Sequence, residues 1–156
     1  MNKVACIFGG TGFLGRMIVH QLCAAGWRVR VATRYPNSAY DLKPSGVVGQ
    51  VAGVQTDLDD PTPAIEGCDA VVHIAARPNI WSGAGHEIIR TNVTGTWNAL
   101  EAAEQAGAKR AVITSSDSTV GFTVLEGKMI PPEYLPIDSK HPLHPTDPYA
   151  LSKVLC

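Results

Sequence analysis

The chain has 156 residues, of which 45% are hydrophobic and 17% are charged, and its formal net charge at pH 7 is −1. A chain of this length can bury a substantial core, because folding removes about two-thirds of the unfolded surface from water at this size. The near-neutral charge excludes a general attraction to nucleic acid or to an anionic membrane, and the longest apolar runs are too short to span a bilayer. We therefore expect a cytoplasmic α/β protein without nucleic-acid or membrane partners.

Cysteine and histidine spacing predicts neither a disulfide framework nor a metal centre. The four cysteines, Cys6, Cys23, Cys68 and Cys156, lie in or beside apolar segments and have no CxxC spacing. Such positions are typical of buried, reduced thiols. The five histidines form no HExxH or zinc-finger pattern, so we expect no metal.

The first predicted strand, from Lys3 to Phe8, leads into the glycine-rich sequence GGTGFLG and a predicted helix from Phe13 to Ala25. A strand, a glycine turn and a helix in this order direct backbone N–H groups toward an anion, with the helix N-terminus behind them. This context predicts a cradle for the pyrophosphate of a dinucleotide. A glycine-rich turn that binds no ligand is the alternative interpretation.

Each glycine of this run has an expected role. Gly9 or Gly10 would permit the tight turn, because a GxGxxG register from Gly10 and a GxxGxxG register from Gly9 both fit. Gly12 would let the phosphates approach the backbone, and Gly15 would let the helix pack closely on the strand.

The second predicted strand, from Arg28 to Thr33, ends beside the residue that bears on cofactor choice. NAD-binding proteins usually carry an acid about twenty residues past the glycines for the ribose 2′-hydroxyl, whereas a nearby Arg accommodates a 2′-phosphate. Here Arg34 follows the strand, and no acid occurs before Asp41. The sequence therefore favours NADP(H). NAD(H), with Arg34 stacked on the adenine, is the alternative.

Strands and helices continue to alternate along the rest of the chain. Further strands are predicted from Val51 to Gln55, Ala70 to Ala75 and Arg110 to Ser115, and further helices from Thr62 to Glu66, His86 to Ala106 and Tyr149 onward. Gly107 is expected to end the long helix, and the proline-rich stretch from Pro131 to Pro148 is expected to be a loop. Asp147 or Thr146 is available to cap the helix that follows.

The alternation predicts an α/β fold, a Rossmann-like doubly wound parallel sheet in one domain over residues 1–156. Right-handed crossovers give the strand order 3-2-1-4-5, with the pyrophosphate above the point where the topology reverses.

Six short motifs follow one another along the chain: GGTGFLG, Asp57-Leu58, His73-Ile74-Ala75-Ala76, Asn92, Thr114-Ser115-Ser116 and Tyr149-Ala150-Leu151-Ser152-Lys153. In this order and spacing they resemble the extended branch of the short-chain dehydrogenase/reductase superfamily, which comprises NAD(P)-dependent epimerases, dehydratases and reductases. The resemblance covers the whole chain. It also implies that the domain stops before the C-terminal strands and the substrate lobe, as in a natural fragment or a truncated gene.

The motifs and the resemblance together place cofactor contacts along five parts of the chain. They are Gly9, Thr11, Gly12, Phe13, Leu14, Gly15, Arg34, Asp57, Leu58, Ala75, Ala76 and Lys153. Asp57 would meet the adenine, with the Leu58 backbone beside it, or would instead cap the next helix. Ala75 and Ala76 would let the chain pass close under the cofactor, or would simply end a strand.

The resemblance assigns the acid/base role to Tyr149. Moving a hydride to or from a carbinol carbon requires a proton at the oxygen, and a phenol can supply it only if its pKa falls from about 10. Tyr149 and Lys153 share one face of a helix, so the ammonium can stabilise the phenolate. Ser116 would hold the substrate oxygen, with Ser115 as the rival. Asn92 would organise the site through backbone or water contacts, unless it faces solvent.

The implied function is an oxidoreductase, epimerase or dehydratase that moves a hydride between nicotinamide and a hydroxyl- or carbonyl-bearing carbon of a small molecule. The full-length parent could be a homodimer, and the isolated 156-residue chain is expected to be inactive because the substrate lobe is absent. Two alternatives stay open. One is a catalytically silent nucleotide sensor or accessory subunit of the same fold, and the other is an inactive fragment that does not fold.

Overall fold

The computed structural model describes residues 3–35, 37, 42, 47–52, 54–122, 124–125 and 128–156. The chain divides into two compact units. Unit 1 comprises Met1–Ala76 and Thr94–Thr114, and unit 2 comprises Arg77–Val93 and Ser115–Cys156.

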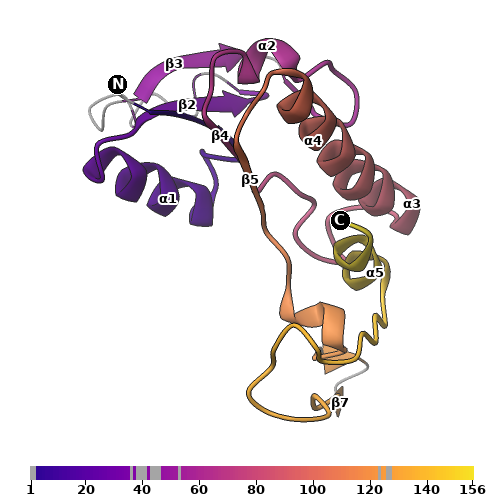
Figure 1. The fold of residues 1–156 in the computed structure, drawn as a ribbon. Coiled ribbons are helices and arrows are strands. Elements are labelled where there is room, and N and C mark those ends of the chain that lie inside the picture. The colour runs from indigo at the N-terminus through magenta and orange to yellow at the C-terminus, as the bar shows by residue number, and fades with distance from the viewer. Residues whose placement is uncertain are drawn as a thin grey trace. The chain divides into compact units, whose positions relative to one another are not determined.

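Unit 1 contains a five-stranded parallel sheet in the order β3-β2-β1-β4-β5 (Figure 1). Its strands are β1 (Val4–Phe8), β2 (Arg28–Thr33), β3 (Val47–Ala52), β4 (Ala70–His73) and β5 (Arg110–Ile113). This is the predicted fold class and strand order. The first and fourth strands lie side by side, as right-handed crossovers require at a switch point.

The predicted position of the third strand is wrong, because β3 lies earlier in the chain than the expected Val51 to Gln55. The backbone N–H groups of Leu58 and Asp59 both donate to the Gln55 carbonyl at 2.8 Å, and the Asp59 carboxylate accepts from the Gln55 N–H at 2.6 Å. These bonds close a turn at Gln55, so this residue cannot continue a strand.

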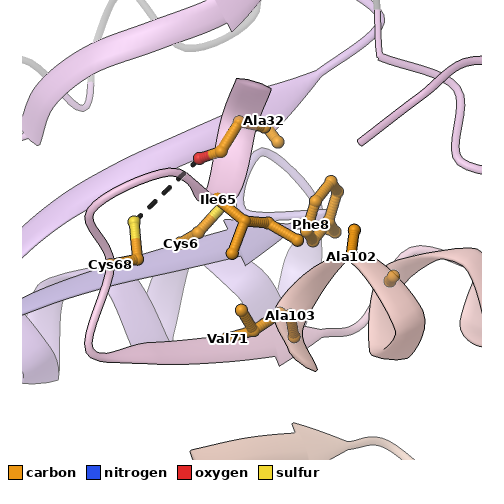
Figure 2. Packing of buried hydrophobic residues seen from close by; sticks show 10 residues of the cluster. Cys6, Phe8, Ala32, Ile65, Cys68, Val71, Ala102 and Ala103 are labelled. Atoms are coloured by element: carbon orange, nitrogen blue, oxygen red, sulfur yellow. Dashed lines mark hydrogen bonds between the residues drawn. The ribbon is translucent and has the colours of Figure 1, made fainter. Parts of the chain in front are cut away.

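The two faces of the sheet are covered by helices from different parts of the chain. On one face, Ile7 and neighbouring β2 residues pack against Val19 of α1 (Phe13–Ala24). On the other face, Phe8 packs with α2 (Thr62–Ile65) and α4 (Gly95–Gln105), and Figure 2 shows this cluster. Successive β1 residues therefore serve opposite faces, as a strand with a period of two requires.

The long helix predicted from His86 to Ala106 is present, but the type of helix changes in its middle. It consists of α3 (Gly85–Ile89), a π-helical turn over Arg90–Thr94 and α4. Single π-turns inside α-helices are frequent at functional sites. The end of α4 follows the prediction: Gly107 has φ +70°, and its N–H donates to the Glu104 carbonyl at 3.0 Å.

Unit 2 contains the 3₁₀ turn Asp117–Val120, a small hairpin and α5 (Pro148–Leu155). The hairpin, formed by β6 (Val124–Leu125) and β7 (Lys128–Met129), was not predicted. The start of α5 is as expected, because the Asp147 carboxylate accepts from the Ala150 N–H at 2.8 Å and a proline occupies the first turn.

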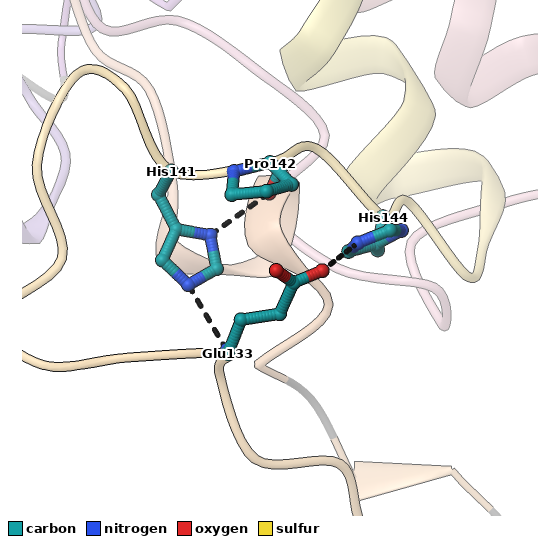
Figure 3. Close-up of polar contacts among 4 residues, drawn as sticks. All are labelled: Glu133, His141, Pro142 and His144. Carbon is teal, nitrogen blue, oxygen red and sulfur yellow. Dashed lines mark hydrogen bonds and ion pairs between the residues drawn. The ribbon is translucent and has the colours of Figure 1, made fainter.

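The proline-rich stretch has no helix or strand between Pro131 and Asp147, but a buried histidine organises it (Figure 3). His141 Nε2 accepts from the Glu133 N–H at 3.1 Å, and its Nδ1–H donates to the Pro142 carbonyl at 2.8 Å. His144 Nε2 lies 2.7 Å from the Glu133 carboxylate. The loop is therefore held by its own polar contacts.

All four cysteines are free thiols. Cys6 and Cys68 are buried as predicted, whereas Cys23 and Cys156 are only half-buried. Within the described ranges, no helix is both long and apolar enough to cross a membrane, and no three His, Cys, Asp or Glu residues lie together as metal ligands.

Candidate functional site

The glycine turn of unit 1 is closed by a hydrogen bond and by steric contacts that admit no side chain at Gly9. The Gly12 N–H donates to the Gly9 carbonyl at 3.0 Å, and Gly9 has φ +86°, a region that favours glycine. A Cβ at Gly9 would lie 2.7 Å from the Ala75 backbone nitrogen. Gly9 rather than Gly10 therefore supplies the left-handed residue of the tight turn.

The start of α1 lies directly on this turn. A Cβ at Gly15 would lie 2.1 Å from the Gly9 carbonyl oxygen and 2.7 Å from the Gly10 Cα. Gly15 thus brings the helix onto the turn, where the sequence had suggested packing on the strand. By contrast, a Cβ at Gly12 would meet only the Gly9 oxygen, at an ordinary 3.4 Å.

The N-terminus of α1 has the features of an anion-binding end. Gly12 is its N-cap and offers no side-chain cap, and the first turn holds no acidic residue. Phe13 and Leu14 of this turn are exposed. Helix N-terminal N–H groups without a side-chain cap are donors for a phosphate. The residues present therefore fit a dinucleotide pyrophosphate.

Arg16 is a candidate binding residue that the sequence reasoning missed. Its Nε donates to the Thr11 carbonyl at 2.9 Å, so the guanidinium lies against the glycine turn. A cation in the first turn of a helix opposes the helix dipole, which prefers acids there. This unfavourable position of a cation is visible in the sequence and could have indicated a binding role for Arg16.

Of the two predicted adenine contacts, the Leu58 backbone N–H is already used in a hydrogen bond within the protein. Asp57 is buried and Leu58 is exposed, but the Leu58 N–H already donates to the Gln55 carbonyl at 2.8 Å. Arg34 is exposed after β2, and its guanidinium lies 5.4 Å from the centre of the Tyr35 ring. Asp41, the first acid after that strand, lies outside the described residues.

The end of β4 passes close to the glycine turn. The N–H groups of Ile74 and Ala75 both donate to the Phe8 carbonyl, at 2.9 and 3.1 Å. Ala75 and Ala76 are half-buried. The Ala75 backbone lies close to Gly9, since a Cβ at Gly9 would lie 2.7 Å from the Ala75 nitrogen and 3.0 Å from its Cα. His73 is buried beside the Phe8 ring, as expected of a core histidine.

All four predicted catalytic residues belong to unit 2. Asn92 lies in the π-helical turn and is buried, so it does not face solvent. Its Oδ1 accepts from the Arg77 N–H at 2.7 Å, and its Nδ2 donates to the Arg77 carbonyl at 3.1 Å and to the Ser152 hydroxyl at 2.8 Å. Its organising contacts are therefore with a backbone segment and with α5.

The helix α5 carries both Tyr149 and Lys153. Lys153 is only 8% exposed, and burial lowers the pKa of its ammonium, while Cys156 acts in the opposite direction. Tyr149 lies four residues earlier on the same helix and is half-buried. Residues at this spacing are neighbours on a helix surface. Burying a lysine costs free energy, and such groups are concentrated at functional sites.

Ser116 is the N-cap of the 3₁₀ turn, which packs against α5. Its Oγ accepts from the Ser118 N–H at 3.2 Å and from the Ser118 hydroxyl at 2.8 Å, and it donates to the Asp117 carboxylate at 3.1 Å. Ser115 is exposed. The sequence reasoning missed both Ser118 and Asp117, which set the state of the Ser116 hydroxyl.

A mostly apolar hollow of about 390 Å³ lies beside α5 in unit 2. It is lined by Gly85, Ile89, Pro145, Thr146, Asp147, Pro148 and Leu151. Unit 1 has a polar hollow of about 320 Å³ between the turn after Gln55 and α4. Neither hollow is lined by the predicted catalytic residues.

Comparisons with known proteins show the family to which the chain belongs. Residues 5–156 match the NAD dependent epimerase/dehydratase family. Human sterol-4-alpha-carboxylate 3-dehydrogenase, decarboxylating, is 33% identical over 98% of this chain and 38% of its own length. Anthocyanidin reductase of Vitis vinifera is 31% identical over 81% of this chain and 40% of its own length. The chain thus spans about two-fifths of the length of these relatives.

Solved structures share the fold. A short-chain dehydrogenase/reductase superfamily protein from Agrobacterium tumefaciens with bound NAD has a TM-score of 0.77 and 32% identity, over 97% of this chain and 42% of the other. The UDP-Glc/GlcNAc 4-epimerase of Campylobacter jejuni has a TM-score of 0.82 over 99% of this chain and 46% of the other. At 21% identity, this second likeness shows the fold alone. The chain belongs to the NAD dependent epimerase/dehydratase family, within the short-chain dehydrogenase/reductase superfamily.

Proposed function

We propose that the chain binds a nicotinamide dinucleotide through unit 1 and supplies the proton-transfer residues of a hydride-transfer reaction through unit 2. When bound, the nucleotide donates or accepts the hydride. The glycine turn and the open N-terminus of α1 would hold its pyrophosphate, with the Arg16 guanidinium beside them. Asp57 and the exposed Leu58 would lie at the adenine.

The observation that carries the proposal is the buried Lys153 on the same helix face as Tyr149. In the proposed reaction, Tyr149 gives a proton to the substrate oxygen during reduction and takes it back during oxidation. The Lys153 ammonium stabilises the phenolate and hydrogen-bonds the nicotinamide ribose.

Ser116 would hold the substrate oxygen, and Asn92 would hold the segment after β4 and α5 in place. Ser116 donates to Asp117 in the present arrangement. Its hydroxyl would have to rotate away from Asp117 to donate to a substrate oxygen. The Ser118 hydroxyl, which donates to Ser116 Oγ, supports that rotation by supplying a hydrogen bond to the same oxygen.

The proposed cofactor is NADP(H), with NAD(H) as the weaker ligand. Arg34 is exposed immediately after β2, where a 2′-phosphate would lie, and no acid stands in the described stretch from Arg28 to Tyr35. A guanidinium pairs bidentately with phosphate.

We further propose a ring hydroxyl or ketone of a polycyclic apolar molecule as the substrate group. The two relatives named above are, by their names, a sterol dehydrogenase and a flavonoid-type reductase. In unit 2, the segment after β4 carries Trp81, which is 84% exposed, and the partly exposed Ile80. Exposed aromatic and aliphatic side chains suit an apolar ring system better than a nucleotide sugar.

The test is a hydride-transfer assay on this chain and on any longer product of its gene. The panel contains a 3-hydroxysterol, a dihydroflavonol and a UDP-hexose, each with NADP(H) and with NAD(H). We expect turnover with the ring alcohols or ketones and NADP(H) in a longer product, its loss in Tyr149→Phe, and no efficient turnover by the 156 residues alone. Turnover with the UDP-hexose alone would overturn the substrate class.

A second candidate function is a catalytically silent nucleotide sensor or accessory subunit of the same fold. The bond from Ser116 to Asp117 favours it, since that bond occupies the only proton of the proposed substrate-binding hydroxyl. Nucleotide binding without turnover across the whole panel, before and after Asp117→Ala, would favour this candidate.

A further inference from the structure

We propose that Ser152 is a positioning residue, which fixes the Tyr149 turn of α5 to the π-helical turn that carries Asn92. The relevance of this link to catalysis rests on the proposed function. The link itself is built from contacts within unit 2.

Ser152 makes two hydrogen bonds with opposite roles. Its hydroxyl donates to the Tyr149 carbonyl at 2.7 Å and accepts from Asn92 Nδ2 at 2.8 Å. The residue is completely buried. A serine that bonds back to a carbonyl three residues earlier is common in helices and bends them slightly. Here the same oxygen is also held from a segment 60 residues away in sequence.

Both N–H bonds of the Asn92 side-chain amide are already used in hydrogen bonds. One of its two N–H bonds serves the Arg77 carbonyl and the other serves Ser152, while its oxygen accepts from the Arg77 N–H. Loss of the Ser152 hydroxyl would leave one buried N–H of Asn92 without an acceptor. Because buried donors are nearly always satisfied, either Asn92 or α5 must then move.

The helix is held by a cap, by packing against α3 and the 3₁₀ turn, and by side-chain hydrogen bonds. At the N-terminal end, Asp147 caps the Ala150 N–H. At the other end, the Cys156 thiol donates to the Ser152 carbonyl at 2.9 Å. Ser152 stands between these points and is the residue whose side chain ties the Tyr149 carbonyl to another element. An isolated helix of eight residues is marginal, so tertiary contacts fix where the first turn lies, and the bond from Ser152 to Asn92 is one of them.

This placement connects Ser152 to proton transfer. A shift of Tyr149 by a fraction of an ångström changes the approach of its hydroxyl to a bound substrate oxygen, and misplacement of about 1 Å can cost about a hundredfold in rate. Nucleotide affinity should change little, because the proposed pyrophosphate and adenine contacts belong to unit 1 and Lys153 is the proposed contact on α5. Ser152→Ala is therefore expected to lower kcat much more than it changes the nucleotide Kd.

The first experiment needs no activity. The whole chain is labelled with 3-fluorotyrosine, and the ¹⁹F line of position 149 is identified by its loss in Tyr149→Phe. We expect Ser152→Ala to shift or split this line and leave the Tyr134 line in place. Ser152→Thr, which keeps the hydroxyl, should restore it, and Leu151→Ala, an exposed neighbour on α5, is the matched control. A position-149 line that is identical in Ser152→Ala and the wild type would overturn the proposal.

The second experiment is kinetic and separates the proposed role of Ser152 from the proposed function of the protein. In an active protein, Ser152→Ala should lower kcat about ten- to a hundredfold and move the midpoint of the pH–rate profile, with little change in the nucleotide Kd. A fall in activity matched only by loss of folded protein, with the same pH midpoint, would contradict positioning. If the wild type transfers no hydride at all, the proposed function fails, whereas the ¹⁹F result still decides the role of Ser152.

Discussion

Gly15 approaches Gly9 so closely that a Cβ at position 15 would lie 2.1 Å from the Gly9 carbonyl oxygen. The contact is with backbone, so it cannot be relieved by a side-chain rotation. We predict that Gly15→Ala lowers the free energy of unfolding by about 1–3 kcal/mol or more, because the helix must move off the turn. Urea denaturation measures this.

Gly12→Ala is the matched control for that substitution. Gly12 has φ −78° and ψ 177°, which alanine adopts, and its Cβ would meet nothing closer than 3.4 Å. We expect a loss of about 1 kcal/mol or less, as for replacing a glycine N-cap by alanine. Equal destabilisation by both substitutions would contradict the packing role of Gly15.

Arg34→Asp should reverse the preference between the two nucleotides. A charge-assisted hydrogen bond to phosphate contributes about 1.5–3 kcal/mol, so the ratio of the two Kd values should change by about tenfold or more. Calorimetric titration of NADPH and NADH into both proteins measures the ratio. An unchanged ratio would remove Arg34 from the 2′-phosphate site.

Tyr149→Phe should remove the proton donor without disturbing the glycine turn. General acid–base catalysis contributes on the order of 10² to 10⁴ in rate, and turnover of the active protein should fall by that amount. The nucleotide Kd should change little, since the substitution removes one hydroxyl from α5. Wild-type turnover in the variant, or complete loss of nucleotide binding, would show that the assigned role is wrong.

The buried Lys153 predicts a rise in stability with pH. Burial lowers the pKa of its ammonium in the folded state below the ordinary value of 10.5. Between these two pKa values the unfolded chain binds more protons than the folded chain, so the free energy of unfolding increases with pH across that window. Below the folded-state pKa, Lys153 is charged in both the folded and the unfolded chain, so the full free-energy cost of burying the charge remains.

Lys153→Met should therefore increase the free energy of unfolding at neutral pH. It should also abolish the increase of that free energy between neutral pH and pH 10.5. The measurement is urea denaturation at a series of pH values. Lys140→Met, at an exposed position of unit 2, is the matched control and should leave the rise intact. A rise that persists unchanged in Lys153→Met would have to come from another group.

The sequence predicts the sheet well because parallel strands buried on both faces are apolar runs separated by turn residues. β2 begins and ends as predicted, and the order 3-2-1-4-5 follows from crossover handedness. β3 was misplaced because the run from Val47 to Gln55 is almost uniformly apolar, and only the hydrogen bonds around Gln55 show where the turn begins.

The sequence proposes candidate site residues but not the hydrogen bonds that connect them. The helical spacing of four between Tyr149 and Lys153 is visible in the sequence, and the structure places both residues on α5, whereas their roles stay predictions. The π-helical turn at Asn92 is not visible, since periodicity cannot distinguish one extra residue in a long helix. The bond from Asn92 to Ser152 joins residues 60 positions apart, which only the folded chain brings together.

Calorimetric titration of NADPH into the wild-type chain and into Gly12→Ala tests nucleotide binding in the glycine turn most directly. A Cβ at Gly12 would meet the Gly9 oxygen at an ordinary 3.4 Å, so the alanine variant should fold but carry a methyl group where the phosphates would approach. We predict binding to the wild type and a loss of about tenfold or more in affinity in the variant. Absence of NADPH and NADH binding by the folded wild-type chain, or equal affinity in Gly12→Ala, would contradict the assignment.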